Sequence, residues 1–203
     1  MSNLIIRHIK TKEKKVFLTF DDGPVEFTEK VLDLLDKHQA KATFFVVGNK
    51  VKAQSEIFKR ILKNQHSIYS HSIDHNFVNL FNHDQKMHAW LHNSLTDLST
   101  HTGQLTKLFR PPAGIITPPM KRVAKKENVK LILWNTRFFD SVHKLKKNKI
   151  DNYIKSCKAG DILLLHDAQS PKNQRLFLES LEHLISSLKN LGFKLTSLQP
   201  SDL

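Results

Sequence analysis

The stretch Val16-Phe17-Leu18-Thr19-Phe20-Asp21-Asp22-Gly23-Pro24 decides the fold, because it joins a strand signal directly to a polar turn. Residues 16–20 are apolar or β-branched, which is typical of a buried strand. The strand is predicted to end at two adjacent acids, Asp21 and Asp22. Successive side chains of a strand point to opposite sides, so one acid can bind a cation while the other handles a proton. A plain turn is the alternative interpretation, because Asp, Gly and Pro favour turns.

Six further apolar runs predict strands, and stripes of apolar residues at helical spacing lie between them. Seven strands that alternate with six helices, without hairpin dipeptides, predict parallel strands joined by crossover helices. The predicted fold is therefore α/β, a single-domain distorted (β/α)7 barrel with parallel strands. The predicted strands are residues 16–20, 42–47, 67–70, 108–110, 129–134, 161–165 and 193–198.

Residues 1–15 are expected to form an N-terminal extension and residues 16–203 one domain, because no linker or repeat divides the chain. The single cysteine, Cys157, excludes an internal disulfide and a zinc site built from cysteines. The short apolar run at residues 4–6 is too little for a secretory leader, and no later stretch is long enough to span a membrane. As written, the chain is expected to be cytoplasmic; removal of a leader would instead imply a secreted or periplasmic protein.

The charge is strongly basic, with 32 Lys and Arg against 19 Asp and Glu and a formal net charge of +13. Such a charge favours anionic partners: nucleic acid, a phospholipid surface, or an anionic glycan or glycolipid. Nucleic acid is not the expected partner, because neither an RNA-binding signature nor an aromatic platform accompanies the charge. A membrane surface stays open as a partner, and a solvated basic face without any partner is the alternative. The oligomeric state is not predicted.

Chemically reactive side chains follow the predicted strands. The carboxyl ends of parallel strands in a barrel converge on one face, where the active sites of this architecture lie. We therefore expect these side chains to share one site. They are Asp21 and Asp22, His71 and His75, Arg110, Asp140 and His166.

His71 and His75 are four residues apart, so one helical turn is expected to present both imidazoles to the same point. With one carboxylate they form a three-ligand set that leaves coordination positions open, which is typical of a catalytic Zn²⁺ site. The same donors also suit Co²⁺, Ni²⁺ or Mn²⁺, so the sequence predicts one divalent ion, with Zn²⁺ preferred. A second pair, His88 and His92, has the same spacing but lies in a predicted helix, and we interpret it as solvent-facing.

In this order, the motifs resemble those of the polysaccharide deacetylases, the NodB-homology or carbohydrate esterase family 4 group. The resemblance covers roughly residues 16–198. It implies a metal-dependent N-deacetylase that hydrolyses the acetamide of an N-acetylated amino sugar, in an oligosaccharide, peptidoglycan or cell-envelope glycan, to amine and acetate. The matching motifs are Thr19-Phe20-Asp21-Asp22-Gly23, His71-Ser72-Ile73-Asp74-His75, Arg110-Pro111-Pro112-Ala113-Gly114, Asp140 and Leu163-Leu164-Leu165-His166.

The resemblance also implies a role for each matching residue. Asp22, His71 and His75 would bind the metal. Asp21 would be the general base, held by Arg110.

On the opposite side of the implied site, His166 would be the general acid, oriented by Asp140. The backbone N–H near Ala113 would stabilise the oxyanion, and Leu164 would line the pocket for the acyl methyl group.

The chain departs from the family pattern around residues that wall the substrate groove. Relatives usually carry Asp-x-x-Asp-Trp where this chain reads Arg137-Phe138-Phe139-Asp140-Ser141, and a common Tyr is replaced by Ala113. We expect a wider groove in which Trp134, Phe138 or Phe139 provides a stacking surface. Because the loops are basic and the usual aromatic residues are absent, a short or anionic substrate is expected, with slow turnover of long neutral chitin.

Two other functions stay open at this point. One is a deacylase or deformylase that acts on a lipid-phosphate-linked amino sugar, which the basic charge and altered pocket favour. The other, from a different class, is a non-catalytic carbohydrate- or nucleic-acid-binding module.

Overall fold

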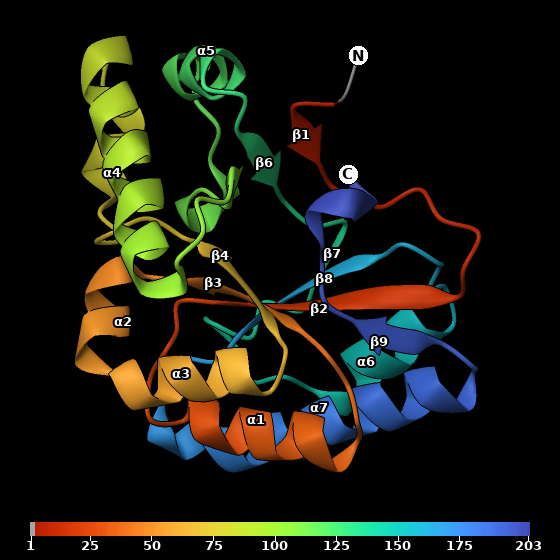
Figure 1. Cartoon of the computed structure of the whole chain (residues 1–203). Coiled ribbons are helices and arrows are strands. Elements are labelled where there is room, and N and C mark those ends of the chain that lie inside the picture. The colour runs from red at the N-terminus through yellow and green to blue at the C-terminus, as the bar shows by residue number, and fades with distance from the viewer. Residues whose placement is uncertain (1–2) are drawn as a thin grey trace.

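The computed structural model describes residues 3–203, in which strands alternate with helices (Figure 1). The two longest strands of the described sheet are neighbours, β2 (Lys15–Asp21) and β8 (Ile162–His166). They pair in parallel over five residues, from Phe17 opposite Ile162 to Asp21 opposite His166. Their apolar side chains are buried on both faces, which is typical of a parallel sheet covered by helices.

All strand pairs of the sheet are parallel, in the order β1-β6-β5-β4-β3-β2-β8-β7, with β9 also paired to β2. The curled sheet is a half-barrel, so the predicted α/β distorted barrel is confirmed. The other strands are β1 (Ile5–Ile6), β3 (Thr43–Val46), β4 (Ser67–Ser70), β5 (Leu108–Phe109), β6 (Lys130–Ile132), β7 (Thr136–Arg137) and β9 (Lys194–Thr196).

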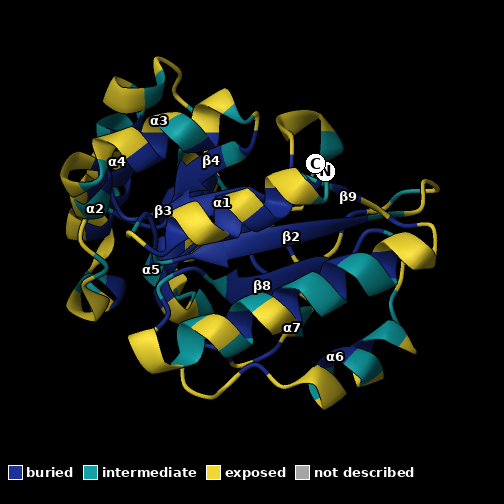
Figure 2. Cartoon of the chain, turned by 90° about the horizontal axis from the view of Figure 1, so that it is seen from below, coloured by how far each residue is buried: buried dark blue, intermediate teal, exposed yellow. Residues whose placement is uncertain are grey.

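The helices bury their apolar stripes against this sheet. Three of them, α1, α3 and α7, lie together over one face, seen from below in Figure 2, while α4 packs against α5 elsewhere. The helix α5 begins directly after Thr117, whose hydroxyl accepts from the backbone N–H of Met120. The helices are α1 (Thr28–Lys37), α2 (Gly48–Ala53), α3 (Ser55–Lys63), α4 (Asp84–Thr102), α5 (Pro118–Lys126), α6 (Lys147–Ile154) and α7 (Pro171–Asn190), with 3₁₀ turns η1 (Phe77–Phe81), η2 (Pro112–Gly114) and η3 (Pro200–Asp202).

Two strands escape the sequence prediction, β1 and β7. Each has two residues, too few for an alternating pattern to show. β1 pairs with β6, Ile5 opposite Leu131, so residues that we expected to form an extension contribute to the sheet. Within residues 3–203, no helix combines the length and the apolar character that crossing a membrane requires.

Candidate active site

The acid doublet lies where β2 ends. Asp21 is the last residue of the strand, and its side chain lies on the same face as that of Thr19 two residues earlier. Asp22 has φ 75°, a left-handed conformation that is uncommon outside glycine and that Asp tolerates better than most residues. The backbone therefore turns sharply between the two acids and gives each carboxylate its own partners.

Arg110 holds the first acid. It lies fully buried after β5, and its Nη1 donates to Asp21 Oδ1 at 2.7 Å and to Thr19 Oγ1 at 2.7 Å. Its Nε and Nη2 donate to the carbonyl oxygens of Ile132 and Leu133, both at 3.1 Å. Burial lowers the pKa of Arg110, and the charge of Asp21 counteracts this effect. One oxygen of Asp21 is thus fixed by the guanidinium, and Oδ2 is left for another partner.

His71 and His75 do not form the predicted helical turn, and this expectation is wrong. No helix is present there; Ser72 has φ 81° and His75 has φ 55°, so the loop doubles back. The Ser72 hydroxyl accepts from the backbone N–H of His75 at 2.9 Å and stabilises this tight shape. The two rings nevertheless meet, with centroids 5.0 Å apart. Local hydrogen bonds and left-handed residues bring the imidazoles together in place of helical spacing.

Asp22, His71 and His75 converge, with one ligand atom of each within 4.8 Å of the others. Asp22 Oδ1 lies 3.5 Å from His71 Nε2 and 3.1 Å from His75 Nε2. Nitrogen and oxygen ligands at about 2.0–2.1 Å from a tetrahedral ion would be roughly 3.3 Å apart, so these separations fit one divalent ion. Burial alone would raise the pKa of Asp22, but its hydrogen bonds to both histidines outweigh burial and lower it. Asp22 is therefore a carboxylate, as a metal ligand must be.

A second contact supports this metal site from behind. His71 Nδ1 lies 2.7 Å from the backbone oxygen of Arg110. A carbonyl oxygen can only accept, so Nδ1 carries the proton, and Nε2 would present its lone pair to a bound ion. This is the usual outer hydrogen bond of a metal-binding histidine.

His166 ends β8, in register with Asp21 on the neighbouring strand. Asp140 is buried and receives two hydrogen bonds from His166: its Oδ1 from the ring Nδ1 at 3.1 Å and its Oδ2 from the backbone N–H at 2.7 Å. Burial would lower the pKa of His166, but Asp140, with Asp21 and Asp22 further away, raises it to about 9. The imidazolium is thus the stable form at neutral pH, and Asp140 fixes its orientation.

The four residues predicted to contact substrate lie around this centre. Ala113 occupies η2 with φ 53°, and Trp134 packs over the neighbouring Gly114, where an added Cβ would lie 2.5 Å from Trp134 Cη2. Leu164 is buried in β8, opposite Thr19 of β2, and Phe139 is 42 % exposed just before Asp140. Their contacts with substrate remain a prediction.

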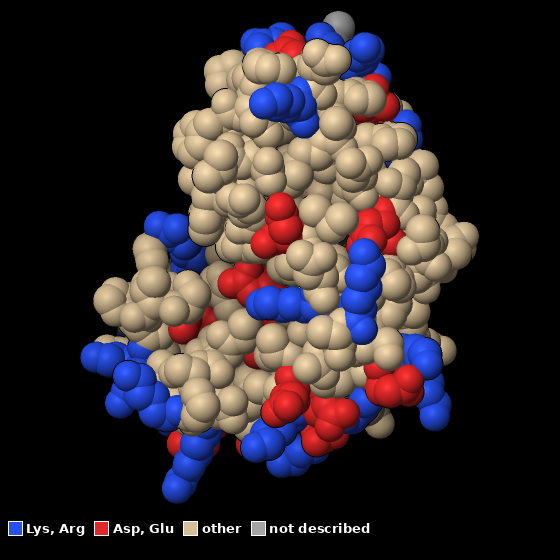
Figure 3. All heavy atoms as spheres, turned by 90° about the vertical axis from the view of Figure 1, so that its left-hand side faces the viewer, with Lys and Arg blue, Asp and Glu red and all other residues tan. Residues whose placement is uncertain are grey.

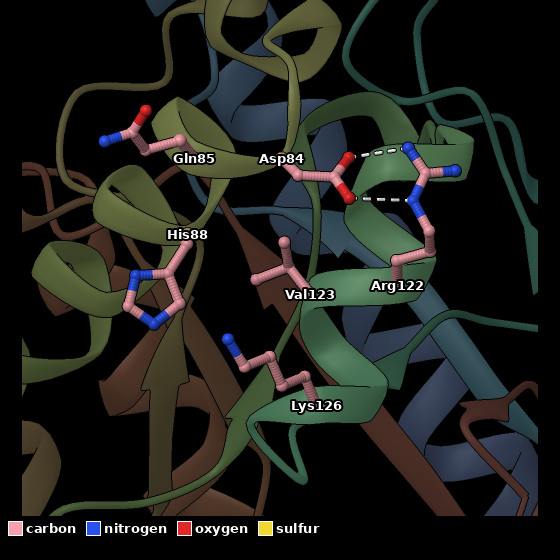
Figure 4. Close-up of a pocket in the computed structure, with 6 residues that line it drawn as sticks. All are labelled: Asp84, Gln85, His88, Arg122, Val123 and Lys126. Carbon is pink, nitrogen blue, oxygen red and sulfur yellow. Dashed lines mark hydrogen bonds and ion pairs between the residues drawn. The ribbon is translucent and has the colours of Figure 1, made fainter.

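The site residues come from the carboxyl ends of the strands, on the left-hand side of Figure 1, which is the side that faces the viewer in Figure 3. Acidic side chains lie in the hollow at the centre of that face, and basic ones gather along its lower left edge. A separate hollow of about 350 Å³ between α4 and α5 contains none of the predicted site residues (Figure 4). There Arg122 is paired with Asp84, and His88 contacts Glu127 at 3.1 Å. This His88 ring is 43 % exposed, so it does face solvent, but it has an acid partner that its sequence neighbourhood did not reveal.

Three supporting residues were not predicted from sequence. Gln169 Nε2 donates to Asp140 Oδ2 at 3.1 Å, and Lys50 Nζ donates to the backbone oxygen of Asp22 at 2.6 Å. The Thr19 hydroxyl accepts from Arg110 Nη1 and donates to the backbone oxygen of Leu163 in β8, both at 2.7 Å. Strand alternation could have identified Thr19, two residues before Asp21, whereas no local pattern marks Gln169 or Lys50.

Asp167 is a further buried acid beside the site. Its Oδ2 accepts from the Thr28 hydroxyl at 2.6 Å, while its Oδ1 has no hydrogen-bond partner. A Cβ at Gly23 would collide with this carboxyl group, so glycine is required directly after the acid doublet. Burial raises the pKa of Asp167 to about 7, although the hydrogen bond from Thr28 opposes the shift.

Replacement of Asp167 by Asn is expected to stabilise the protein more at pH 8 than at pH 5. The folded pKa of this acid lies above its ordinary value, so the unfolded chain releases the proton first and stability falls as pH rises from about 4 to 7. The variant lacks this titration. Urea unfolding of both proteins at the two pH values measures the difference, and an equal difference at both would contradict the raised pKa.

Comparison with known proteins identifies the family. The model of the family described as "Polysaccharide deacetylase" matches residues 8–132, and the chain belongs to this family.

Individual relatives span nearly the whole chain. A peptidoglycan-N-acetylglucosamine deacetylase of Bacillus cereus is 31% identical over 92% of this chain and 87% of its own length. The peptidoglycan-N-acetylmuramic acid deacetylase PdaA of Bacillus subtilis is 33% identical, over 93% and 71%. The crystal structure of a peptidoglycan N-acetylglucosamine deacetylase in complex with 4-naphthalen-1-yl-N-oxidanyl-benzamide matches 98% of this chain and 92% of that chain, with a TM-score of 0.86 and 27% identity. The chain is thus homologous to hydrolases that deacetylate glycans.

Proposed function

We propose that this protein is a metal-dependent N-deacetylase that hydrolyses the acetamide of an N-acetylated amino sugar in a cell-envelope glycan. The observation that carries the proposal is one cluster, Asp22, His71 and His75, set between a buried Asp21–Arg110 pair and a His166–Asp140 pair. Relatives named as deacetylases of peptidoglycan and of chitooligosaccharide support the substrate class.

Asp22, His71 and His75 would hold the ion, and Zn²⁺ is proposed because two imidazoles and one carboxylate are a common catalytic zinc set. When bound, such an ion acts as a Lewis acid towards the amide oxygen and lowers the pKa of water. Co²⁺, Ni²⁺ and Mn²⁺ accept the same donors, so metal content decides between them.

Asp21 is proposed as the general base. Arg110 fixes one of its oxygens, which leaves Oδ2, 3.7 Å from His71 Nε2, to accept the proton of the attacking water. The buried guanidinium also keeps the carboxylate pointed at the metal cluster.

His166 is proposed as the general acid. Its Nδ1–H is held by Asp140, so the proton at Nε2 is the one that can pass to the departing amine nitrogen. Transfer of this proton and release of acetate complete the hydrolysis. The backbone N–H near Ala113 and the side chain of Leu164 are proposed to contact the acetyl group.

The test is a screen for released acetate on N-acetylglucosamine oligomers and peptidoglycan glycan strands, with the Zn²⁺-loaded and the chelator-stripped protein. We expect acetate and free amine only with the loaded protein. His88→Ala serves as a control, because it removes a histidine outside the site and should retain activity. Metal-free protein that deacetylates as fast as the loaded form would contradict the proposal.

A further inference from the structure

Arg137 lies at the rim of the proposed site. It is the last residue of β7 and pairs with Leu164 of β8, two residues before His166. Residues two apart on a strand share a face. Leu164 and His166 therefore lie on one face of β8, and Arg137 is the strand neighbour of Leu164. The following residues of the chain lead to Asp140, which holds His166. Arg137 is therefore connected to the proposed general acid through both β8 and its own loop.

Two cations pack on one aromatic ring at this rim. The guanidinium carbon of Arg137 lies 3.9 Å from the ring centroid of Phe139, and Lys149 Nζ lies 5.6 Å from the same centroid. Lys149 also donates to the backbone oxygen of Phe138 at 3.3 Å, which fixes its position. Both positive charges lie at the same ring, so an anion bound within reach of both would be stabilised by both. We call Arg137, Phe139 and Lys149 the cationic platform.

No acid neutralises the platform. In the part of the chain that the structure describes, neither Arg137 nor Lys149 forms an ion pair, whereas the arginines of α3, α5 and α7 each have a carboxylate partner. The nearby Asp140 is buried and engaged by His166 and Gln169. Three exposed lysines follow in the same loop and at the start of α6, and they add to the positive potential: Lys144, Lys146 and Lys147.

The backbone holds the platform in a strained shape. Phe139 has φ 59°, which is unusual for a bulky side chain, and its carbonyl oxygen accepts from the N–H of His143 at 2.9 Å. Strained residues persist where the surroundings determine them, and they cluster at functional sites. This conformation allows Asp140 to turn inwards to His166 while the preceding ring stays 42 % exposed beneath the guanidinium.

We propose that Arg137 and Lys149 bind an oxyanion carried by the glycan next to the acetamide that is hydrolysed. The planar guanidinium donates two parallel hydrogen bonds, which match a carboxylate or a phosphate. The ring of Phe139 contributes an apolar surface for a sugar. The substrate class is therefore an anionic amino-sugar chain, and this inference rests on the proposed function.

The test measures binding and turnover separately. Binding is measured by calorimetry with the Asp21→Asn variant, which should bind glycans without hydrolysing them. The probes are a neutral N-acetylglucosamine tetramer, a peptide-free strand of N-acetylglucosamine and N-acetylmuramic acid, which carries carboxylates, and the neutral tetramer with a terminal phosphate. We expect an anionic probe to bind at least ten times more tightly than the neutral one, and the two anionic probes distinguish a carboxylate from a phosphate.

Adding Arg137→Gln is expected to weaken binding of the preferred anionic probe tenfold or more and to affect the neutral probe much less. In the active protein the same change should raise KM for that substrate more than it lowers kcat. Arg137→Lys should recover part of the loss, because it keeps the charge without the planar fork. Arg175→Gln, which removes a surface arginine of α7 that is paired with Glu179, is the matched control.

Equal loss on neutral and anionic probes would overturn the cationic platform, as would equal binding of all three probes by the unaltered Arg137 protein. A wrong proposed function would give a different experimental result. In that case the loaded protein releases no acetate from any probe, whereas the calorimetric comparison still decides whether Arg137 and Lys149 recognise an oxyanion.

Discussion

Asp22→Ala is expected to remove bound metal and activity together, whereas Asp21→Asn should keep the metal and lose turnover by about 10²–10⁴-fold. Asp22 Oδ1 lies within 3.5 Å of both histidine Nε2 atoms and is a member of the ligand cluster. One oxygen of Asp21 instead accepts a hydrogen bond from Arg110, and the amide oxygen of asparagine can still accept it. The two acids are adjacent but have different partners, so their substitution should affect metal content and turnover differently.

Metal content by atomic emission and acetate release from the same preparations check this expectation. His75→Ala should resemble Asp22→Ala, and His92→Ala, on the exposed side of α4, should resemble the unaltered protein. Equal metal loss from Asp21→Asn and Asp22→Ala would show that the two acids bind the ion together, and the division of roles would be wrong.

His166→Asn is expected to reduce kcat by about 10²–10⁴-fold without loss of metal, because it removes only the proposed proton donor. The pH profile gives a sharper test. Asp140 is the main group that raises the pKa of His166 to about 9, against the effect of burial. A general acid must be protonated, so activity should fall as pH rises through the pKa of this histidine.

Asp140→Asn should move this fall in kcat/KM to lower pH, because it removes the negative charge that raises the pKa of His166 most. Asparagine can keep a hydrogen bond to the ring, so the rate at pH 6 should suffer less than the rate at pH 9. The measurement is kcat/KM from pH 6 to pH 10 for both proteins, with metal content monitored at each pH. A basic limb that stays in place would show that another group provides the proton.

The sequence predicted the fold class, and it predicted that reactive side chains would gather at one edge of the sheet, because both depend on local patterns. Buried parallel strands are continuous apolar runs, and residues that follow such strands must gather at one edge. This reasoning placed the acid doublet beside His166, which is distant in sequence, and the structure confirms the adjacency of Asp21 and His166.

Other features could not be predicted, because they depend on contacts between distant segments or on backbone conformations without a pattern. The loop that joins His71 to His75 is shaped by two left-handed residues and a serine hydroxyl, where spacing alone indicated a helical turn. Gln169 reaches Asp140 across 29 positions of sequence, and β7 has only two residues. These three features can be identified only from the folded structure.

Arg110 contacts two site residues, one through its side chain and one through its backbone. Its guanidinium fixes Asp21, while its backbone oxygen accepts a hydrogen bond from His71 Nδ1 at 2.7 Å. A substitution removes the guanidinium and its contact with Asp21. The backbone oxygen is present in every amino acid, so the contact with His71 can remain. A substitution at this position would therefore remove the support of the proposed general base and leave the orientation of the proposed metal ligand unchanged, so the two properties can be lost separately.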